Sequence, residues 1–446
     1  MRKEIRPLLK SFLLLSLPTV AEQILSTLFQ YVDTAMVGRL GEEATASVSV
    51  TSTIGWLVGS VIYGGGAAIL TLTARAYGAK DREKGEKLSS LSLILSLIFG
   101  VLIGGISILL SPHIPVWMGA DVRIRDQASR YFTIISLPMF FRSLTALCGS
   151  AVRGAQDTRR PMLISVLASV MNVILDYILI YPCGYGVDGA AAATALCVTF
   201  SGIMNLLLMR RTPFLRGAGY RMPDRQLVRE CLQLAFPVMG ISCVTCMGYV
   251  VFAGLVSGMG TTIFAAHSIA VTAETVFYIP GYGLRTATTA LTGAAVGEGN
   301  GEKFSIYCRI AAGLTVGMMV LSGIALYFCA DWLMGLFTPS ERVVQLGAQM
   351  LRLVAFSEPF FGLYVVLEGI YYGMGQTRYP FWVEAVSIWG VRILFTYLCV
   401  RVWNLGLLEV WYCMIADNVT KALLLFAPFL KGGKRGFRMD ENLLHF

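Results

Sequence analysis

Residues 153–162 read RGAQDTRRPM, and residues 372–381 read YGMGQTRYPF. The two stretches align at an offset of 373 − 154 = 219 residues, and their identical positions are Gly154/Gly373, Thr158/Thr377, Arg159/Arg378 and Pro161/Pro380. The same offset, without a gap, also pairs Pro18 with Pro237, Gly41 with Gly260, Tyr63 with Tyr282, and Glu83-Lys84 with Glu302-Lys303. One register held over so many glycine and polar positions predicts that the chain is a duplication.

Composition places both copies in a membrane. Of 446 residues, 56% are hydrophobic and 14% are charged, and the mean hydropathy is +0.66. Apolar windows of about 20 residues predict twelve spans, near 11–37, 45–75, 88–110, 127–150, 161–181, 189–209, 231–257, 262–296, 305–329, 343–371, 380–400 and 410–430. The runs are continuous and do not alternate as barrel strands do. We therefore expect an all-α polytopic membrane protein whose first apolar run is a retained span.

The duplication and the span count together predict two six-helix bundles. An even number of spans returns each copy to the same side, so the repeats are parallel and a pseudo-two-fold axis lies along the membrane normal. The expected division is an N-terminal bundle over 1–210, a linker over 211–230 and a C-terminal bundle over 231–446.

The net charge of +9 is carried by basic residues in short clusters between apolar runs. Most clusters fall on one side of the predicted topology, which indicates a cytoplasmic side with both termini on it. These clusters contain Arg2, Lys3, Arg6, Lys80, Arg82, Lys84, Lys87, Arg159, Arg160, Lys303, Arg378, Lys431, Lys434, Arg435 and Arg438, and the linker. The linker alone also fits an anionic-lipid or nucleic-acid patch, but the topological interpretation is favoured, and no nucleic-acid partner is expected.

Several motifs resemble the multidrug and toxic compound extrusion (MATE) family of cation-coupled antiporters. They are LPTVAEQILSTLFQYVDTAMVGRLG, GGGAAILTLTARAYGAKDREKGEKL, RGAQDTRRPMLISVLASVMNVILDYILIY, GVDGAAAATAL and the second-half YYGMGQTRYP. The resemblance implies two bundles forming a V in the cell membrane, and export of organic, often cationic, drugs against inward Na⁺ or H⁺ movement. It implies no cofactor, and we expect a monomer in the lipid bilayer.

The resemblance also implies a cation site in the first bundle, with an Asp in span 1, an Asn and an Asp in span 5, and a Thr in span 6. The matching residues are Asp33, Asn172, Asp176 and Thr194. If the coupling ion is Na⁺, these four are its ligands.

The residues support this site independently. Asn172 and Asp176 are four residues apart, hence on one helical face, and carboxylate, amide and hydroxyl oxygens suit a small hard cation. In the second copy, 219 residues later, the corresponding residues are Phe252, Val391, Phe395 and Cys413. The repeated fold therefore does not require the four polar residues. The structural alternative is that Asp176 caps its helix or pairs with a buried arginine, for which Arg142 is the best candidate.

The second half has intramembrane acids of its own. Glu274 and Glu368 are candidates for binding a cationic substrate, although pairing with Arg285 or Arg392 is an equally open interpretation. Aromatic residues provide cation–π partners for such a substrate, and the candidates are Tyr31, Tyr63, Tyr249 and Phe277.

Pro18 and Pro237 are equivalent prolines inside spans 1 and 7, where each removes a backbone hydrogen bond and permits a bend. They are candidate hinges, and a static kink is the alternative.

The leading hypothesis is a secondary antiporter that exports organic cations by alternating access. The alternative is a flippase for a lipid-linked oligosaccharide, which predicts a cavity lined with arginine. An enzyme is not expected, because the sequence has no GxSxG, HExxH or phosphate-binding loop.

Overall fold

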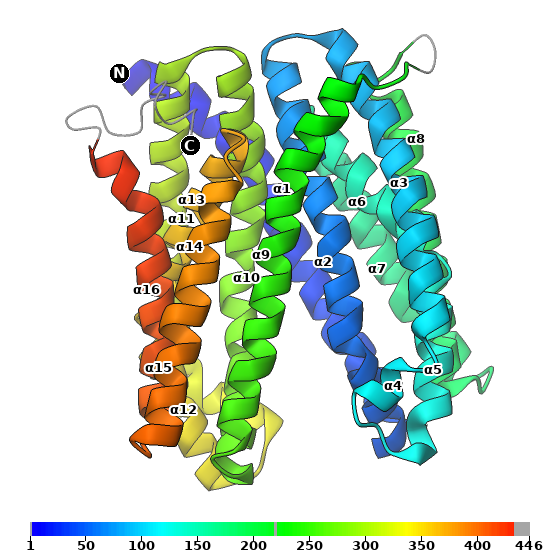
Figure 1. The fold of residues 1–446 in the computed structure, drawn as a ribbon, viewed down its shortest axis with the longest axis vertical. Coiled ribbons are helices and arrows are strands. Elements are labelled where there is room, and N and C mark those ends of the chain that lie inside the picture. Colours follow the sequence, from blue (N-terminus) through cyan, green and yellow to red (C-terminus); the bar gives the residue numbers. More distant parts are fainter. Residues whose placement is uncertain (1, 218–220, 432–446) are drawn as a thin grey trace. The chain divides into compact units, whose positions relative to one another are not determined.

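The computed structural model describes residues 2–217 and 221–431. Within these ranges it contains helices and no strand. The helices are α1 (Arg2–Gly38), α2 (Glu42–Gly78), α3 (Arg82–Leu110), α4 (Ile114–Trp117), α5 (Val122–Ser136), α6 (Met139–Gly154), α7 (Arg159–Ile180), α8 (Gly186–Arg211), α9 (Arg225–Ser257), α10 (Thr261–Gly297), α11 (Gly301–Phe337), α12 (Glu341–Ala355), α13 (Glu358–Gly373), α14 (Arg378–Ser387), α15 (Leu394–Tyr397) and α16 (Leu407–Lys431), with π-helical segments η1 (Ile388–Ile393) and η2 (Leu398–Val402). Figure 1 shows them in chain order. The predicted basic cluster at Lys434, Arg435 and Arg438 lies outside the described residues.

The prediction of an all-helical membrane protein is confirmed. In the described residues, ten helices are long and apolar enough to cross a membrane. Two bent pairs, α5 with α6 and α12 with α13, bring the number to the predicted twelve if each pair is one span. The bends measure 46° and 54°. Each bend has a proline at the start of its second helix, Pro138 before α6 and Pro359 in the first turn of α13. Proline lacks the N–H that a continuous helix needs, so these two prolines favour the breaks.

The duplication extends to the helix boundaries. The bounds of α2, Glu42 and Gly78, shifted by 219 residues, give 261 and 297, which are the bounds of α10. The residues preceding these helices, Gly41 and Gly260, have φ of 112° and 119°. This backbone region strongly favours glycine, so both copies use the same turn.

The chain divides by contacts into two compact units. We call residues Ala21–Met239 the N-unit and residues Met1–Val20 with Gly240–Phe446 the C-unit. The division falls two residues after Pro18 and two residues after Pro237, inside α1 and α9. The units therefore divide these two helices, whereas the sequence repeat divides the chain at the linker.

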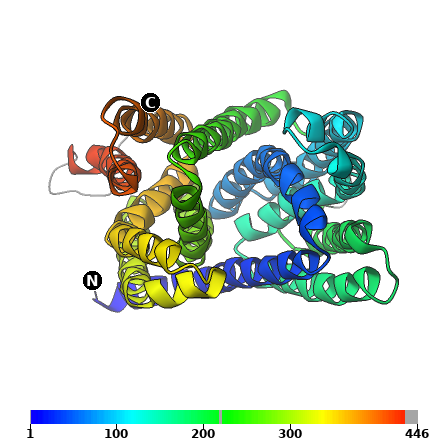
Figure 2. The same ribbon diagram turned by 90° about the horizontal axis from the view of Figure 1, so that it is seen from below.

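In the N-unit, α6 packs against α2, α3 and α8, and the start of α9 joins the same core. The buried residues that this start contributes are Leu227, Cys231, Leu234 and Ala235. Gly64 of α2 permits the close approach, because a Cβ there would lie 3.0 Å from the backbone nitrogen of Met239. Figure 2 shows the helices of the unit end-on.

In the C-unit, α10 packs against α11 and α13, and the start of α1 joins their core through Phe12. A Cβ on Gly283 would lie 2.6 Å from Cα of Val20, and Thr19 Oγ1 donates to the Gly283 carbonyl at 2.8 Å. Since 64 + 219 = 283 and 20 + 219 = 239, this contact and the Gly64–Met239 contact are the same contact in the two copies.

The eleventh span departs from its copy. Its counterpart α7 is a regular α-helix, whereas the eleventh span contains η1 and η2. π-helical turns are rare and often occur at functional sites. Here η1 carries Arg392, a buried arginine.

Candidate cation site

Helices α1 and α7 hold the two aspartates predicted for the cation site, Asp33 and Asp176. Tyr181, which follows α7, donates from Oη to the carbonyl of Met36 in α1 at 3.1 Å. Beside it lies a small apolar cluster that includes Val37 of α1 and Ile180 of α7. Asp33 lies about one turn before Met36, and Asp176 lies about one turn before Ile180. This packing fixes both acids at the same end of the unit.

The carboxyl groups of Asp33 and Asp176 are neighbours that interact electrostatically. Asp176 is fully buried, and neither of its carboxyl oxygens has a donor among the described residues. Oδ1 of Asp33 is enclosed and lacks a donor as well. Two carboxylates this close repel each other unless a proton or a cation lies between them. A neighbouring pair of carboxyl groups without donors therefore favours the binding of a proton or a cation.

Asn172 and Thr194 lie at the level of the pair. Asn172 is one turn before Asp176 on α7, and its amide Nδ2 is enclosed without an acceptor in the described part of the chain. On α8, a Cβ at Gly189 would lie 2.8 Å from the carbonyl oxygen of Leu179. Helices α7 and α8 run antiparallel. Thr194 is five residues after Gly189 on α8, so it lies level with the residue five before Leu179 on α7, which is between Asn172 and Asp176.

Neither structural alternative for Asp176 is found. Arg142 of α6 forms no ion pair with any described residue, and its Nε has no acceptor. Its electrostatic partner is Tyr131 of α5, which also interacts with Asp33 and Asp176. Asp176 does not cap α7 either, since its oxygens accept no hydrogen bond. The acids remain uncompensated by protein groups in the described ranges.

The two predicted hinges lie inside continuous helices, Pro18 in α1 and Pro237 in α9. Four residues after Pro18, Glu22 accepts hydrogen bonds from Arg153 Nη2 and from Ser165 Oγ, both at 2.6 Å. This ion pair was not predicted from the sequence. It holds the N-unit part of α1 to α6 and α7 just beyond the predicted hinge.

The C-unit places the predicted substrate acids differently. Glu368 accepts hydrogen bonds at 2.5 Å from Arg285 Nη1 and from Tyr372 Oη. Glu274 forms no ion pair with any described residue, but its carboxyl group interacts electrostatically with Arg392. Arg392 is instead bound to Asp417, with Nη2 2.9 Å from Oδ2. Glu368 is thus paired with an arginine, which was one of the two interpretations left open, whereas Glu274 is not.

The predicted aromatic residues are divided between the units. Tyr31 and Tyr63 belong to the N-unit, and 41% of the Tyr63 side chain is exposed. Tyr249 and Phe277 belong to the C-unit. The guanidinium carbon of Arg392 lies 5.3 Å from the centre of the Tyr249 ring, while Phe277 packs against the core. Tyr249 therefore already has a cationic partner.

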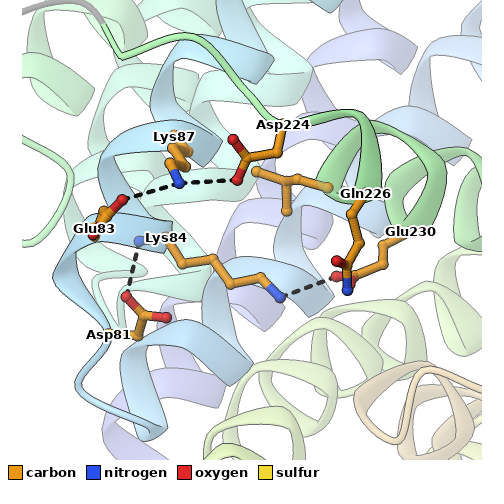
Figure 3. A pocket seen from close by; sticks show the side chains of 8 residues that line it. Asp81, Glu83, Lys84, Lys87, Asp224, Gln226 and Glu230 are labelled. Carbon is orange, nitrogen blue, oxygen red and sulfur yellow. Dashed lines mark hydrogen bonds and ion pairs between the residues drawn. The ribbon is translucent and has the colours of Figure 1, made fainter.

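A polar groove of about 330 Å³ lies where α9 begins in the N-unit. As Figure 3 shows, Lys84 binds Glu230 at 3.0 Å, and Lys87 binds Asp224 at 2.9 Å and Glu83 at 3.0 Å. The groove lies beyond the end of the 37-residue helix α2, whereas Asp33 lies on α1 before the start of α2, so most of the length of α2 separates them. Its ion pairs attach α9 to α3 and are separate from the cation site.

A buried network of ion pairs in the C-unit was not predicted from the sequence either. Lys421 Nζ lies 2.8 Å from Glu384 and 3.1 Å from Asp417, which in turn binds Arg392. Ser387 Oγ donates to Asp417 at 2.6 Å and Thr245 Oγ1 to Glu384 at 2.9 Å. The available signal was the i,i+4 spacing of Asp417 and Lys421 in an apolar helix.

Comparisons with known proteins identify the family. The sequence profile of the MatE family matches residues 18–178 and 237–398, one segment in each copy. The chain is 28% identical over 436 residues to the probable multidrug resistance protein NorM of Thermotoga maritima, covering 97% of this chain and 94% of that protein.

Two solved structures are similar over most of the chain. One is the outward-facing conformation of a multidrug resistance MATE family transporter of the MOP superfamily, with a TM-score of 0.88 and 25% identity over 96% of both chains. The other is a MOP superfamily transporter from Pyrococcus furiosus Vc1 described by a binding pocket of reverse polarity, with a TM-score of 0.87 and 25% identity over 94% of both chains. The protein therefore belongs to the MatE family of membrane transporters and is not an enzyme.

Proposed function

We propose that the protein is a cation-coupled antiporter that exports organic, cationic drugs or toxins from the cell by alternating access. Asp33, Asn172, Asp176 and Thr194 bind the coupling ion, Na⁺ or H⁺. The family and the names of its relatives support export of drugs. The observation that carries the coupling is the Asp33–Asp176 pair, two adjacent carboxyl groups that no described donor compensates.

The pair supports competition between the two ions. With a proton bound, one carboxyl donates to the other, and the pair carries a single negative charge. When Na⁺ binds, both carboxylates are ionised and supply oxygen ligands, with the Asn172 amide and the Thr194 hydroxyl as neutral donors. One site thus exchanges H⁺ for Na⁺, and the apparent affinity for Na⁺ falls as the pH falls through the range in which the pair takes up its proton.

The energy available from one ion depends on the charge of the drug. A single charge moving down about 100 mV releases about 2.3 kcal/mol, which supports a concentration ratio of about fiftyfold for a neutral drug. A one-for-one exchange against a monovalent cationic drug moves no net charge, so the concentration gradient of the coupling ion drives it. The external ion favours the state that releases the drug, and the drug favours inward release of the ion. Each step therefore requires the other, and the exchange is obligatory. We place the protein in the cell membrane as a monomer with both termini in the cytoplasm, on the charge asymmetry of the loops.

The test is efflux of a cationic dye from proteoliposomes under an imposed Na⁺ or H⁺ gradient. Asp33→Asn and Asp176→Asn should each abolish the acceleration by the gradient, because an amide cannot lose a proton or offer a charged ligand. Asp126→Asn is the matched control, since Asp126 is an exposed acid of α5 in the same unit. Gradient-driven efflux that is equal in wild type and in both site variants would refute the coupling.

The alternative, a flippase for a lipid-linked oligosaccharide, requires free cationic side chains for an anionic substrate. In the described part of the C-unit, Arg285, Arg392 and Lys421 are each bound to an acid, which favours the antiporter. Vesicles that move no cationic dye but translocate such a lipid would establish the flippase instead.

A further inference from the structure

Two cysteine side chains of the C-unit are in direct contact. Cys399 belongs to η2, at the end of the eleventh span, and Cys413 belongs to α16, which is the twelfth span. Their sulfur atoms lie 3.9 Å apart, and either thiol can donate a hydrogen bond to the other. The antiport mechanism proposed above gives neither thiol a role.

Both thiols are enclosed near one end of the unit. The side chains of Cys399 and Cys413 are 6% and 7% exposed. Cys399 lies three residues before the end of η2 at Val402, and Cys413 lies six residues after the start of α16 at Leu407. At about 3.6 residues per turn, both lie within about two helical turns of the loop 403–406. The thiol pair is therefore buried by packing, but close to a helix–helix connection.

Backbone hydrogen bonds fix this connection. The N–H of Trp403 donates to the carbonyl of Leu398 at 2.9 Å, and the N–H of Leu405 donates to the carbonyl of Cys399 at 2.8 Å. Asn404 between them has a φ of 50°, in the left-handed region that allows a tight reversal of the chain. The backbone of Cys399 is thus tied to the loop that leads into α16.

The contact leaves a short path to a covalent bond. A disulfide has an S–S distance of about 2.05 Å, so the two sulfurs must approach each other by about 1.9 Å. Rotation about the Cα–Cβ bond moves each sulfur between staggered positions. The segments that carry the two cysteines, η2 and α16, already pack against each other. Side-chain rotation is therefore the main movement that the bond requires.

The repeated fold does not require these thiols. Cys399 corresponds to 399 − 219 = 180, which is Ile180, and Cys413 corresponds to 413 − 219 = 194, which is Thr194. In the N-unit, Ile180 packs in an apolar cluster and Thr194 is a predicted cation ligand. Two cysteines that meet at positions where the other copy has neither are a property of the C-unit alone.

We propose that Cys399 and Cys413 are a redox-sensitive pair, which forms a disulfide that clamps the end of the eleventh span to the twelfth. The oxidant is a small-molecule disulfide. One cysteine sulfur attacks it, breaks its S–S bond and releases a first small thiol; the other cysteine sulfur then attacks this mixed disulfide and releases the second. The two protons of the cysteine thiols end on the two released thiols, so one disulfide is reduced as the other forms.

The proposed topology gives the bond a setting. It places the loop between the last two spans outside the cell, opposite the basic clusters, and disulfides form and persist in such oxidising compartments. The bond closes a loop of 413 − 399 = 14 residues and so restricts the unfolded chain. This setting rests on the proposed function, whereas the bond itself is measured on purified protein, so either proposal can fail without the other.

Peptide mapping of the unaltered chain tests the pair. Purified protein is treated with dipyridyl disulfide, an apolar oxidant that reaches buried thiols, at about pH 8, near the ordinary pKa of a thiol. Remaining thiols are blocked with N-ethylmaleimide, and the protein is digested without reduction. Mass spectrometry should find the peptides of Cys399 and Cys413 joined and lighter by two hydrogen atoms. The exposed Cys183 reports that the oxidant is active; modified Cys183 without the joined peptides overturns the proposal.

Variants and melting test the clamp. Cys399→Ser and Cys413→Ser should each abolish the joined peptides, whereas Cys329→Ser, a half-buried cysteine of α11, should retain them. Closing a loop of this length should raise the melting temperature of oxidised wild type by about 6–12 °C over the reduced form, followed by tryptophan fluorescence. Cys399→Ser should show no such rise. Joined peptides without a rise overturn the clamp, and so does an equal rise in Cys399→Ser.

Discussion

Replacing Lys421 by Met should destabilise the C-unit strongly. Lys421 is 2% exposed and binds Glu384 and Asp417, which are 8% and 0% exposed. Removing one member of a buried ion pair costs about 3–5 kcal/mol, because the remaining charge stays buried without compensation. Among the described residues, Asp417 keeps Arg392 and Ser387 as partners, whereas Glu384 keeps the Thr245 hydroxyl. The cost therefore falls on Glu384, and we expect about 3 kcal/mol.

The assay is thermal unfolding in detergent, followed with a thiol-reactive fluorogenic dye. Buried cysteines occur in both units, including Cys231, Cys308 and Cys413, so unfolding exposes them. With about 2–4 °C per kcal/mol for a unit of this size, the melting temperature should fall by about 6–12 °C. Lys303→Met is the matched control, because the Lys303–Glu298 pair is about 30% exposed and worth at most about 1 kcal/mol.

A second variant isolates the cause. Lys421→Met combined with Glu384→Gln removes the uncompensated charge and should recover much of the lost stability. If Lys421→Met melts at the same temperature as Lys303→Met, or if the double variant is less stable than the single one, the argument from buried charge is refuted.

Two further predictions use the same melting assay. Gly283→Ala places a Cβ 2.6 Å from the backbone of Val20 and should lower the stability by about 1–3 kcal/mol. Its control, Gly254→Ala, has open space around the new Cβ and should be neutral or stabilising by up to about 1 kcal/mol. Equal melting temperatures for these two variants would contradict the close approach. Arg153→Met leaves Glu22, 15% exposed, with Ser165 as its partner and should lower the stability by about 3 kcal/mol. Its control, Arg130→Met, breaks an exposed pair with Asp188 and should cost less than about 1 kcal/mol. A larger effect at Arg130 than at Arg153 would refute this ranking.

The spans and the repeat were predictable because both are recorded along the chain. Hydropathy over about 20 residues identifies a span, and the 219-residue offset is confirmed in the shared helix boundaries of α2 and α10. The breaks at Pro138 and Pro359 were not predicted. A proline also occurs within the unbroken α1, at Pro18, so its presence alone does not decide whether a span breaks.

The residues of the candidate site were predictable from the sequence, but the ion pairs of the acidic residues were not. The family resemblance indicated Asp33, Asn172, Asp176 and Thr194, and the structure places the two acids side by side. Sequence left open whether Asp176 pairs with Arg142 and whether Glu274 or Glu368 pairs with an arginine. Packing decided each case: Arg142 has no acidic partner in the described chain, Glu368 binds Arg285, and Arg392 binds Asp417 rather than Glu274.

The sequence by itself determined that this chain crosses a membrane as helices, that it is built twice from one template, and that each copy carries acids the other lacks. Only the tertiary structure decided which of those acids are neutralised. The physical reason is that hydropathy and spacing are properties of neighbours along the chain, whereas an ion pair depends on how each helix is rotated about its own axis against its neighbours. That rotation leaves Asp33 beside Asp176, while it brings Glu384, Asp417 and Glu368 to a cation.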